Sequence, residues 1–191
     1  MKIYESYHGT NNECANNIQA NGIQIDIPTM ANESGKKHKK KIPGSFGYGF
    51  YTFVNDKELA SDFAVRINTE CNSVTLKIIS EIDENRLLSF LDLDDRENYH
   101  AFYEQAHKSA MLHLKRFGTH LDTEVQHVLE GIIIEMFLQK LFTKEKIRVI
   151  AVLGESYTPR KKGKYLYSNI PNGQELCIRD KSIIKSCNKA N

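Results

Sequence analysis

The sequence predicts an α+β fold, because strand-like segments gather towards the two ends of the chain and helical segments lie between them. No G-x-G-x-x-G motif opens a strand–helix–strand unit, which argues against a doubly wound parallel sheet. The chain has 191 residues, of which 40% are hydrophobic. This is enough for one sizeable hydrophobic core, but too little for two domains unless both are small. We therefore expect a single domain that spans residues 1–191.

The N-terminal part predicts a strand, a helix and a long loop. Ile3 to Tyr7 alternates polar residues with aromatic and β-branched ones, which is typical of a strand. Thr10, Asn11 and Asn12 offer capping side chains for a helix that ends at Asn21-Gly22. Residues 29–48 contain Pro, Gly, Ser and a lysine-rich run at 36–41, a composition that predicts a mobile loop.

A second strand and helix follow this loop. Gly49 to Val54 is a short apolar strand, and Asn55-Asp56 caps the helix after it. Apolar residues recur at helical spacing in that segment, at Leu59, Ala60, Phe63, Ala64 and Ile67. Ser73 to Ile82 then gives the clearest strand pattern of the chain.

The middle of the chain predicts an α-helical insertion over about residues 96–143. Leu87 to Asp95 is first apolar and then acidic, and fits no single element. Arg96 to Phe117 has helical periodicity, and Asp122 starts a second helix that runs to about Phe142.

The C-terminal part predicts three strands. Ile147 to Leu153 is apolar throughout, and Pro159 to Lys164 is a basic turn region. Glu175 to Ile178 and Ser182 to Ser186 are expected to form a hairpin through residues 179–181.

Charge and cysteine content exclude several classes of protein. The net charge of +2, from 26 basic and 24 acidic side chains, gives no overall attraction to nucleic acid or to an anionic membrane. No apolar stretch approaches the roughly 20 residues of a membrane-spanning helix, and Met1 to Glu5 begins like a strand, without the apolar core of a signal peptide. The four cysteines have no C-x-x-C spacing, so free thiols and a cytoplasmic location are expected.

Two further clusters each allow two interpretations. His113, His120 and His127 recur every seven residues near Glu124, yet Gly118-Thr119 interrupts the helix and no further carboxylate completes a metal shell, so no metal is expected. The lysine-rich run 36–41, with basic residues at 160–164, could attract phosphates, or could be a solvated loop.

Three motifs in chain order carry the functional hypothesis. They are Tyr7-His8-Gly9-Thr10, Gly47-Tyr48-Gly49-Phe50-Tyr51 and Asn172-Gly173-Gln174-Glu175-Leu176. Together they resemble the His-Tyr-Glu signature of ADP-ribosyltransferases of the diphtheria-toxin and poly(ADP-ribose)-polymerase type. The segment after Tyr51, with Glu58-Leu59-Ala60 and Asp62-Phe63-Ala64, is also similar to bacterial members. The resemblance implies two packed, mostly antiparallel sheets around a cleft for a bent NAD.

The first motif would contact NAD through His8 and Gly9. By resemblance, His8 bonds the adenosine-side ribose, and the Gly9 backbone bonds the nicotinamide carboxamide. A glycine lets backbone approach a ligand closely, because no side chain intervenes. Thr10 is included among the expected NAD contacts. Taken alone, a His-Gly pair at a strand end is more often a capped turn.

The second motif would supply Tyr51 as the aromatic ring that stacks on nicotinamide, with Phe50 beside it. Offset stacking is worth on the order of 1 kcal/mol beyond burial. The alternative is that Phe50 and Tyr51 simply alternate between core and solvent along the strand.

The third motif would supply Glu175 as the catalytic carboxylate. Cleavage of the nicotinamide glycosidic bond passes through an oxocarbenium-like state, which a carboxylate stabilises. The resemblance also gives Glu175 a hydrogen bond to the nicotinamide ribose. Arginine-directed members carry an acidic or amide residue two positions earlier, and Gly173 stands there, so arginine is disfavoured as the acceptor.

The sequence thus predicts a mono-ADP-ribosyltransferase that uses NAD as co-substrate, without a metal, and has the catalytic residues His8, Tyr51 and Glu175. The acceptor would be a macromolecule, either a protein side chain or a nucleic acid such as RNA. The motifs resemble small bacterial members, which implies a bacterial toxin or phage-defence effector, for which an antitoxin would be a partner. The alternatives are a catalytically inactive binding module of the same fold and an NAD glycohydrolase.

Overall fold

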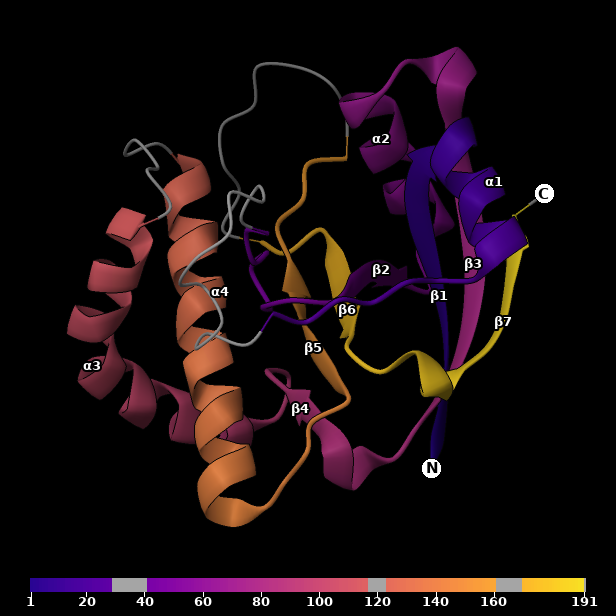
Figure 1. Cartoon of the computed structure of the whole chain (residues 1–191). Coiled ribbons are helices and arrows are strands. Elements are labelled where there is room, and N and C mark those ends of the chain that lie inside the picture. Colours follow the sequence, from indigo (N-terminus) through magenta and orange to yellow (C-terminus); the bar gives the residue numbers. More distant parts are fainter. Residues whose placement is uncertain (29–40, 117–122, 161–169, 191) are drawn as a thin grey trace.

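The computed structural model describes residues 1–28, 41–116, 123–160 and 170–190. In these residues the protein has an α+β fold, with a mixed seven-stranded sheet and four α-helices (Figure 1), so the predicted class is confirmed. The strands are β1 (Lys2–Asn11), β2 (Phe50–Val54), β3 (Ser73–Ile82), β4 (Leu87–Ser89), β5 (Ala151–Ser156), β6 (Gly173–Ile178) and β7 (Ile184–Lys189). The helices are α1 (Asn12–Asn21), α2 (Lys57–Ile67), α3 (Leu93–Arg116) and α4 (Thr123–Lys140).

The sheet forks between its two halves. The strand order is β4-β5-β6-β2-β1-β3-β7, and only β4 and β5 pair in parallel. β1 pairs with β3 along its whole length, but with β2 only at Ser6↔Val54 and Tyr7↔Phe53. From His8 onward β1 follows β3, while the first part of β2 follows β6. One continuous, forked sheet therefore stands where two packed sheets were expected.

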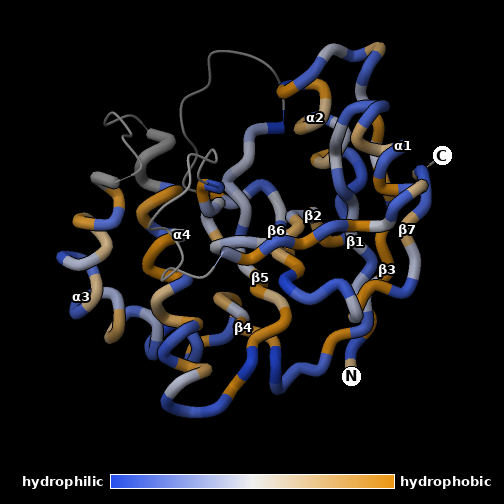
Figure 2. The backbone as a smooth tube through the Cα atoms, viewed as in Figure 1, coloured by the Kyte–Doolittle hydropathy of each residue, from blue (hydrophilic) through white to orange (hydrophobic). Residues whose placement is uncertain are grey.

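Both faces of the sheet are covered. Alternate residues of β5 and β6 enter two different clusters, as strand geometry requires: Val152 and Cys177 pack with α3 and α4, whereas Leu153 and Leu176 pack on the opposite face. α3 and α4 lie side by side at one end of the sheet, and α1 and α2 lie at the other (Figure 1). Hydrophobic residues concentrate in α4 and in the central strands (Figure 2).

The predicted N-terminal capping residues of α1 and α2 are confirmed. The Asn11 side chain accepts a hydrogen bond from the Cys14 backbone N–H at 2.7 Å. The Asp56 carboxylate accepts one from the Leu59 N–H at 2.9 Å. These bonds satisfy donors that a helix N-terminus otherwise leaves unpaired. The periodic pattern of α2 fails at its last position, because Ile67 is 56% exposed.

The predicted C-terminal hairpin is wrong. β6 lies between β5 and β2 in the middle of the sheet, whereas β7 is an edge strand on β3. The linking residues do not form a tight turn: the Arg179 and Asp180 N–H groups donate to the Ile150 carbonyl, and a 3₁₀ turn over Lys181–Ile183 follows. The chain thus crosses from the middle of the sheet to its edge between two strands that the sequence predicted to be paired.

The central helices lie close to their predicted bounds, and α3 starts at Leu93, earlier than expected. The next strand was placed too early, since Ile147 to Ile150 lies outside β5. The Ile150 N–H instead donates to the Arg86 carbonyl, and the Ile150 carbonyl accepts from the Arg179 N–H. Among the described residues, no helix combines the length and apolar character needed to cross a membrane.

Candidate functional site

The three motif residues lie on three adjacent strands. His8 is on β1, Tyr51 on β2 and Glu175 on β6, and these strands are neighbours in the order β6-β2-β1. Glu175 pairs with Phe53, and Phe53 pairs with Tyr7, so one row crosses all three strands. With strands about 4.8 Å apart, the two ends of this row are separated by about 10 Å. Segments far apart in the sequence thus meet at the fork of the sheet.

Tyr51 and Glu175 share one face of the sheet, and His8 lies on the other. Tyr51 pairs with Cys177, two residues after Glu175, so strand alternation places their side chains on the same side. The His8 ring instead packs on Phe50, with ring centroids 4.3 Å apart. The three side chains therefore do not project in a common direction, although their strands meet.

His8 closes the base of the fork. Its Nδ1 lies 2.8 Å from the Tyr51 carbonyl oxygen, just past the last β1–β2 residue pair. Because a carbonyl can only accept, Nδ1 carries the proton and donates this bond. Burial lowers the pKa of His8 from 6.5, and the bond to the Tyr51 carbonyl opposes this shift in part. The neutral ring thus ties β1 to β2 where ordinary strand pairing ends.

This arrangement predicts a pH dependence of stability that His8 controls. The lowered pKa in the folded state gives stability above pH 6.5 that is lost as the pH falls below it, because the unfolded chain then takes up the proton first. Between pH 7.5 and 5.5 the loss from one such group is at most about 1.4 kcal/mol. We expect His8→Gln to show a smaller difference between urea midpoints at the two pH values. An unchanged difference would contradict this role of His8.

Gly9 has a packing reason for being glycine. A Cβ at this position would lie 1.9 Å from the Ala60 carbonyl oxygen of α2. The absent side chain therefore admits a helix, whereas the sequence suggested room for a ligand. Thr10, the next residue, is 8% exposed. Contacts of these two residues with NAD stay a prediction.

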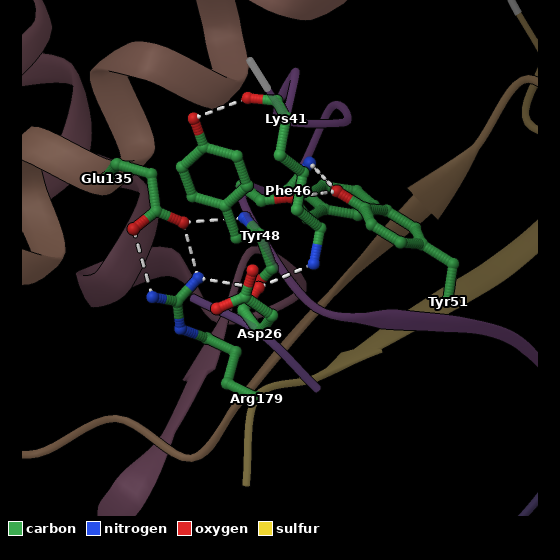
Figure 3. Close-up of polar contacts among 8 residues, drawn as sticks. Asp26, Lys41, Phe46, Tyr48, Tyr51, Glu135 and Arg179 are labelled. Atoms are coloured by element: carbon green, nitrogen blue, oxygen red, sulfur yellow. Dashed lines mark hydrogen bonds and ion pairs between the residues drawn. The ribbon is translucent and has the colours of Figure 1, made fainter. Parts of the chain in front are cut away.

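The hydroxyl of Tyr51 is held by the loop that precedes β2, here called the 44–49 loop (residues 44–49). It accepts a hydrogen bond from the Phe46 N–H at 2.9 Å and donates one to the Gly47 carbonyl at 2.6 Å (Figure 3). A Cβ on Gly44 would lie 2.5 Å from the same hydroxyl. Burial is the main cause that raises the pKa of Tyr51. The ring is thus a neutral, fixed aromatic surface.

A buried ion pair anchors the 44–49 loop to the helices. Arg179 Nη1 lies 2.5 Å from Glu135 Oε1, and each side chain is 8% exposed. Glu135 Oε1 also accepts from the Tyr48 N–H at 2.6 Å, and Arg179 donates to the Tyr48 carbonyl at 2.7 Å (Figure 3). At Gly47, where φ is +83°, a Cβ would lie 2.3 Å from Glu135 Oε1. The ion pair therefore bonds both the backbone N–H and the backbone carbonyl of Tyr48.

Two hydroxyl groups orient the carboxylate of Glu175. Ser156 and Thr158 both donate to its Oε1, the Thr158 bond being 2.9 Å long. Oε2 has no hydrogen bond with any described residue, so it can accept one from a ligand. Arg66 of α2 is attracted by this carboxylate, which opposes the lowering of the Arg66 pKa by burial. The site thus has a fixed, half-buried negative charge, one oxygen of which is not bonded by any residue that the structure describes.

The residues that support this site were not predicted from the sequence. Ser156 and Thr158 follow an apolar strand at a spacing of two, which places both hydroxyls on one side of the backbone. That spacing could have predicted that both hydroxyls face the same group. Glu135 and Arg179 gave none, because their contact depends on α4 lying across the end of β6.

The other sequence clusters lie largely outside the described part of the chain. Residues 36–40 and 161–164 lie outside the described part of the chain, and Arg160 is paired with Asp56 at 2.5 Å. His120 and the side chain of Glu124 also lie outside it. Within the described ranges, no three His, Cys, Asp or Glu side chains come together as a metal site would need. All four cysteines are free thiols, and burial is the main cause that raises the pKa of Cys177 to about 12.

Comparison with known proteins leaves these residues to be interpreted from their own geometry. No protein-family model matches the chain, and no curated protein matches it significantly.

Proposed function

We propose that this protein is a mono-ADP-ribosyltransferase that binds NAD at the fork of the sheet and cleaves its nicotinamide glycosidic bond. The observation that carries the proposal is the Glu175 carboxylate, held through one oxygen by Ser156 and Thr158, while its other oxygen has no hydrogen bond to the described residues. It shares a face with the ring of Tyr51. An aromatic surface beside an oriented negative charge suits a flat cationic ring whose bond to ribose must break.

The fork offers NAD an unpaired strand edge. From His8 to Asn11, β1 pairs with β3 and has no described strand on its other side. Backbone donors and acceptors along such an edge can bond an amide, which fits the expected contact of Gly9 with the nicotinamide carboxamide. His8 lies at the base of this edge, next to Phe50. In the proposal, Thr10 and Phe50 complete the walls of the nucleotide site.

The chemistry needs only residues of this chain and an acceptor. The bond between the nicotinamide nitrogen and the ribose C1 breaks, and nicotinamide leaves as a neutral molecule with the electron pair. The positive charge that develops on the ribose is stabilised by Glu175 through its charge. The acceptor then forms the new bond to C1 and releases its proton to the Glu175 carboxylate or to water.

A catalytically inactive module is the second candidate, and one observation favours it. The Tyr51 hydroxyl is fully engaged by Phe46 and Gly47, so the 44–49 loop already lies against the ring that nicotinamide would use. If the 44–49 loop does not move away from the Tyr51 ring, NAD can bind at most through its adenosine half. Transfer to water, which makes the protein an NAD glycohydrolase, is the third outcome.

One experiment separates the three. The protein is incubated with NAD labelled in the adenine, with and without separated protein, RNA and DNA fractions, and nicotinamide and labelled macromolecules are measured. A transferase releases nicotinamide and labels one fraction. A glycohydrolase releases nicotinamide without labelling, and an inactive module does neither while still binding NAD in calorimetry. Neither release nor binding would reject the whole proposal.

A further inference from the structure

A second site lies beside the first, in a cavity between α3, α4 and the end of β5. Its volume is about 460 Å³, within the range usual for small-molecule sites. The lining comes from five separate parts of the chain: the 44–49 loop, the segment after β4, α3, α4 and the end of β5. None of the three motif residues belongs to it.

Five of the eleven residues that line the cavity are phenylalanine or tyrosine. Tyr99 and Tyr103 come from α3, Phe90 from the segment after β4, Phe46 from the 44–49 loop and Tyr157 from the residue that follows β5. Phe46 and Phe90 stand nearly parallel, with centroids 6.0 Å apart. Such faces bind flat ligands by stacking, and every nucleobase offers a flat face.

The charged groups of the lining narrow the ligand class. Glu130 and Glu155 supply carboxylate acceptors, and Arg96 supplies a guanidinium that forms no ion pair with the described residues. A purely cationic ligand would meet repulsion from Arg96. A base with two adjacent N–H donors and a neighbouring oxygen acceptor can satisfy a carboxylate and a guanidinium together, and guanine has this pattern.

The hydroxyl of Tyr99 offers a polar contact at this place. Tyr99 is 9% exposed and lines the cavity, and no hydrogen bond of its hydroxyl to another described residue is formed. Burial is the main cause that raises its pKa, and the charge of Glu130 adds to the effect. A hydroxyl that reaches the cavity can donate a hydrogen bond to a bound ligand or accept one from it.

We propose that this cavity binds a guanine base, stacked between aromatic side chains and read by Glu155 and Arg96. The site also adjoins the Glu175 centre. Along one short segment, Glu155 and Tyr157 line the cavity, while Ser156 and Thr158 hold Glu175. Binding stands on the cavity alone; a role in presenting a guanine-containing acceptor rests on the proposed function.

Calorimetry without NAD tests the binding directly. GMP is expected to saturate one site, and IMP, which lacks the 2-amino donor, to bind about tenfold more weakly. Glu155→Gln should weaken GMP about tenfold and bring GMP and IMP to similar affinity. The matched control is Glu13→Gln on α1, which should bind GMP as the wild type does, since Glu13 is exposed and remote from the cavity lining.

The outcomes distinguish the two proposals. No binding of GMP, equal binding of AMP and GMP, or preferential binding of an arginine amide would overturn the guanine site. GMP binding in a protein that releases no nicotinamide from NAD leaves the site standing and removes the transferase. Nicotinamide release by a protein that does not bind GMP supports the transferase and removes the guanine site.

Discussion

Replacing Glu175 by glutamine is expected to lower the rate of nicotinamide release from NAD about 100- to 1000-fold. The amide oxygen of glutamine can still accept the hydrogen bonds of Ser156 and Thr158, so the side chain keeps its position. What disappears is the negative charge that faces the developing positive charge on the ribose. Because charge stabilisation acts mainly in the transition state, kcat should fall and KM should change little.

The matched control is the neighbouring residue. Gln174 is exposed and points to the opposite side of β6, so Gln174→Ala should release nicotinamide at the wild-type rate. Urea denaturation of both variants should give wild-type midpoints, which separates a loss of chemistry from a loss of folding. Equal rates for Glu175→Gln and the wild type would show that Glu175 is not the catalytic carboxylate.

The sequence predicts local structure well where the determinants are local. The Asp56 cap, the alternation of Ser73 to Ile82 and the Asn11 cap depend on residues within a few positions of one another, and the structure has each of them. β6 and β7 were misassigned for the opposite reason. Their separation depends on which strands lie between them, and no short-range pattern encodes that choice.

The candidate site also has features that the sequence indicates and features that only the fold determines. His8, Tyr51 and Glu175, which were expected around one NAD, lie on neighbouring strands, but strand alternation places the His8 ring on the other face. The role expected of Gly9 shows a second limit. A glycine is readable as a place of close approach, yet only the fold reveals that α2 is what approaches.

Breaking the buried pair of Glu135 and Arg179 on one side is expected to have the largest effect on stability. Glu135→Gln keeps an oxygen for the Tyr48 N–H but leaves the Arg179 guanidinium, 8% exposed, without its counter-charge. Removal of one partner of such a pair costs about 3–5 kcal/mol of unfolding free energy. Urea denaturation measures it, and Glu81→Gln, at the exposed pair with Lys185, is the control expected to change little.

The double variant Glu135→Leu/Arg179→Met separates charge burial from positioning of the loop. Without either charge, most of the lost stability should return, because desolvation of the ions no longer has to be offset. The backbone of Tyr48 nevertheless loses both of its side-chain partners, so the 44–49 loop that holds the Tyr51 hydroxyl is released. A stable double variant with impaired nicotinamide release would assign the pair to positioning of Tyr51. Equal destabilisation of single and double variants would instead show that the loss comes from packing and hydrogen bonds and that the buried charge is not its cause.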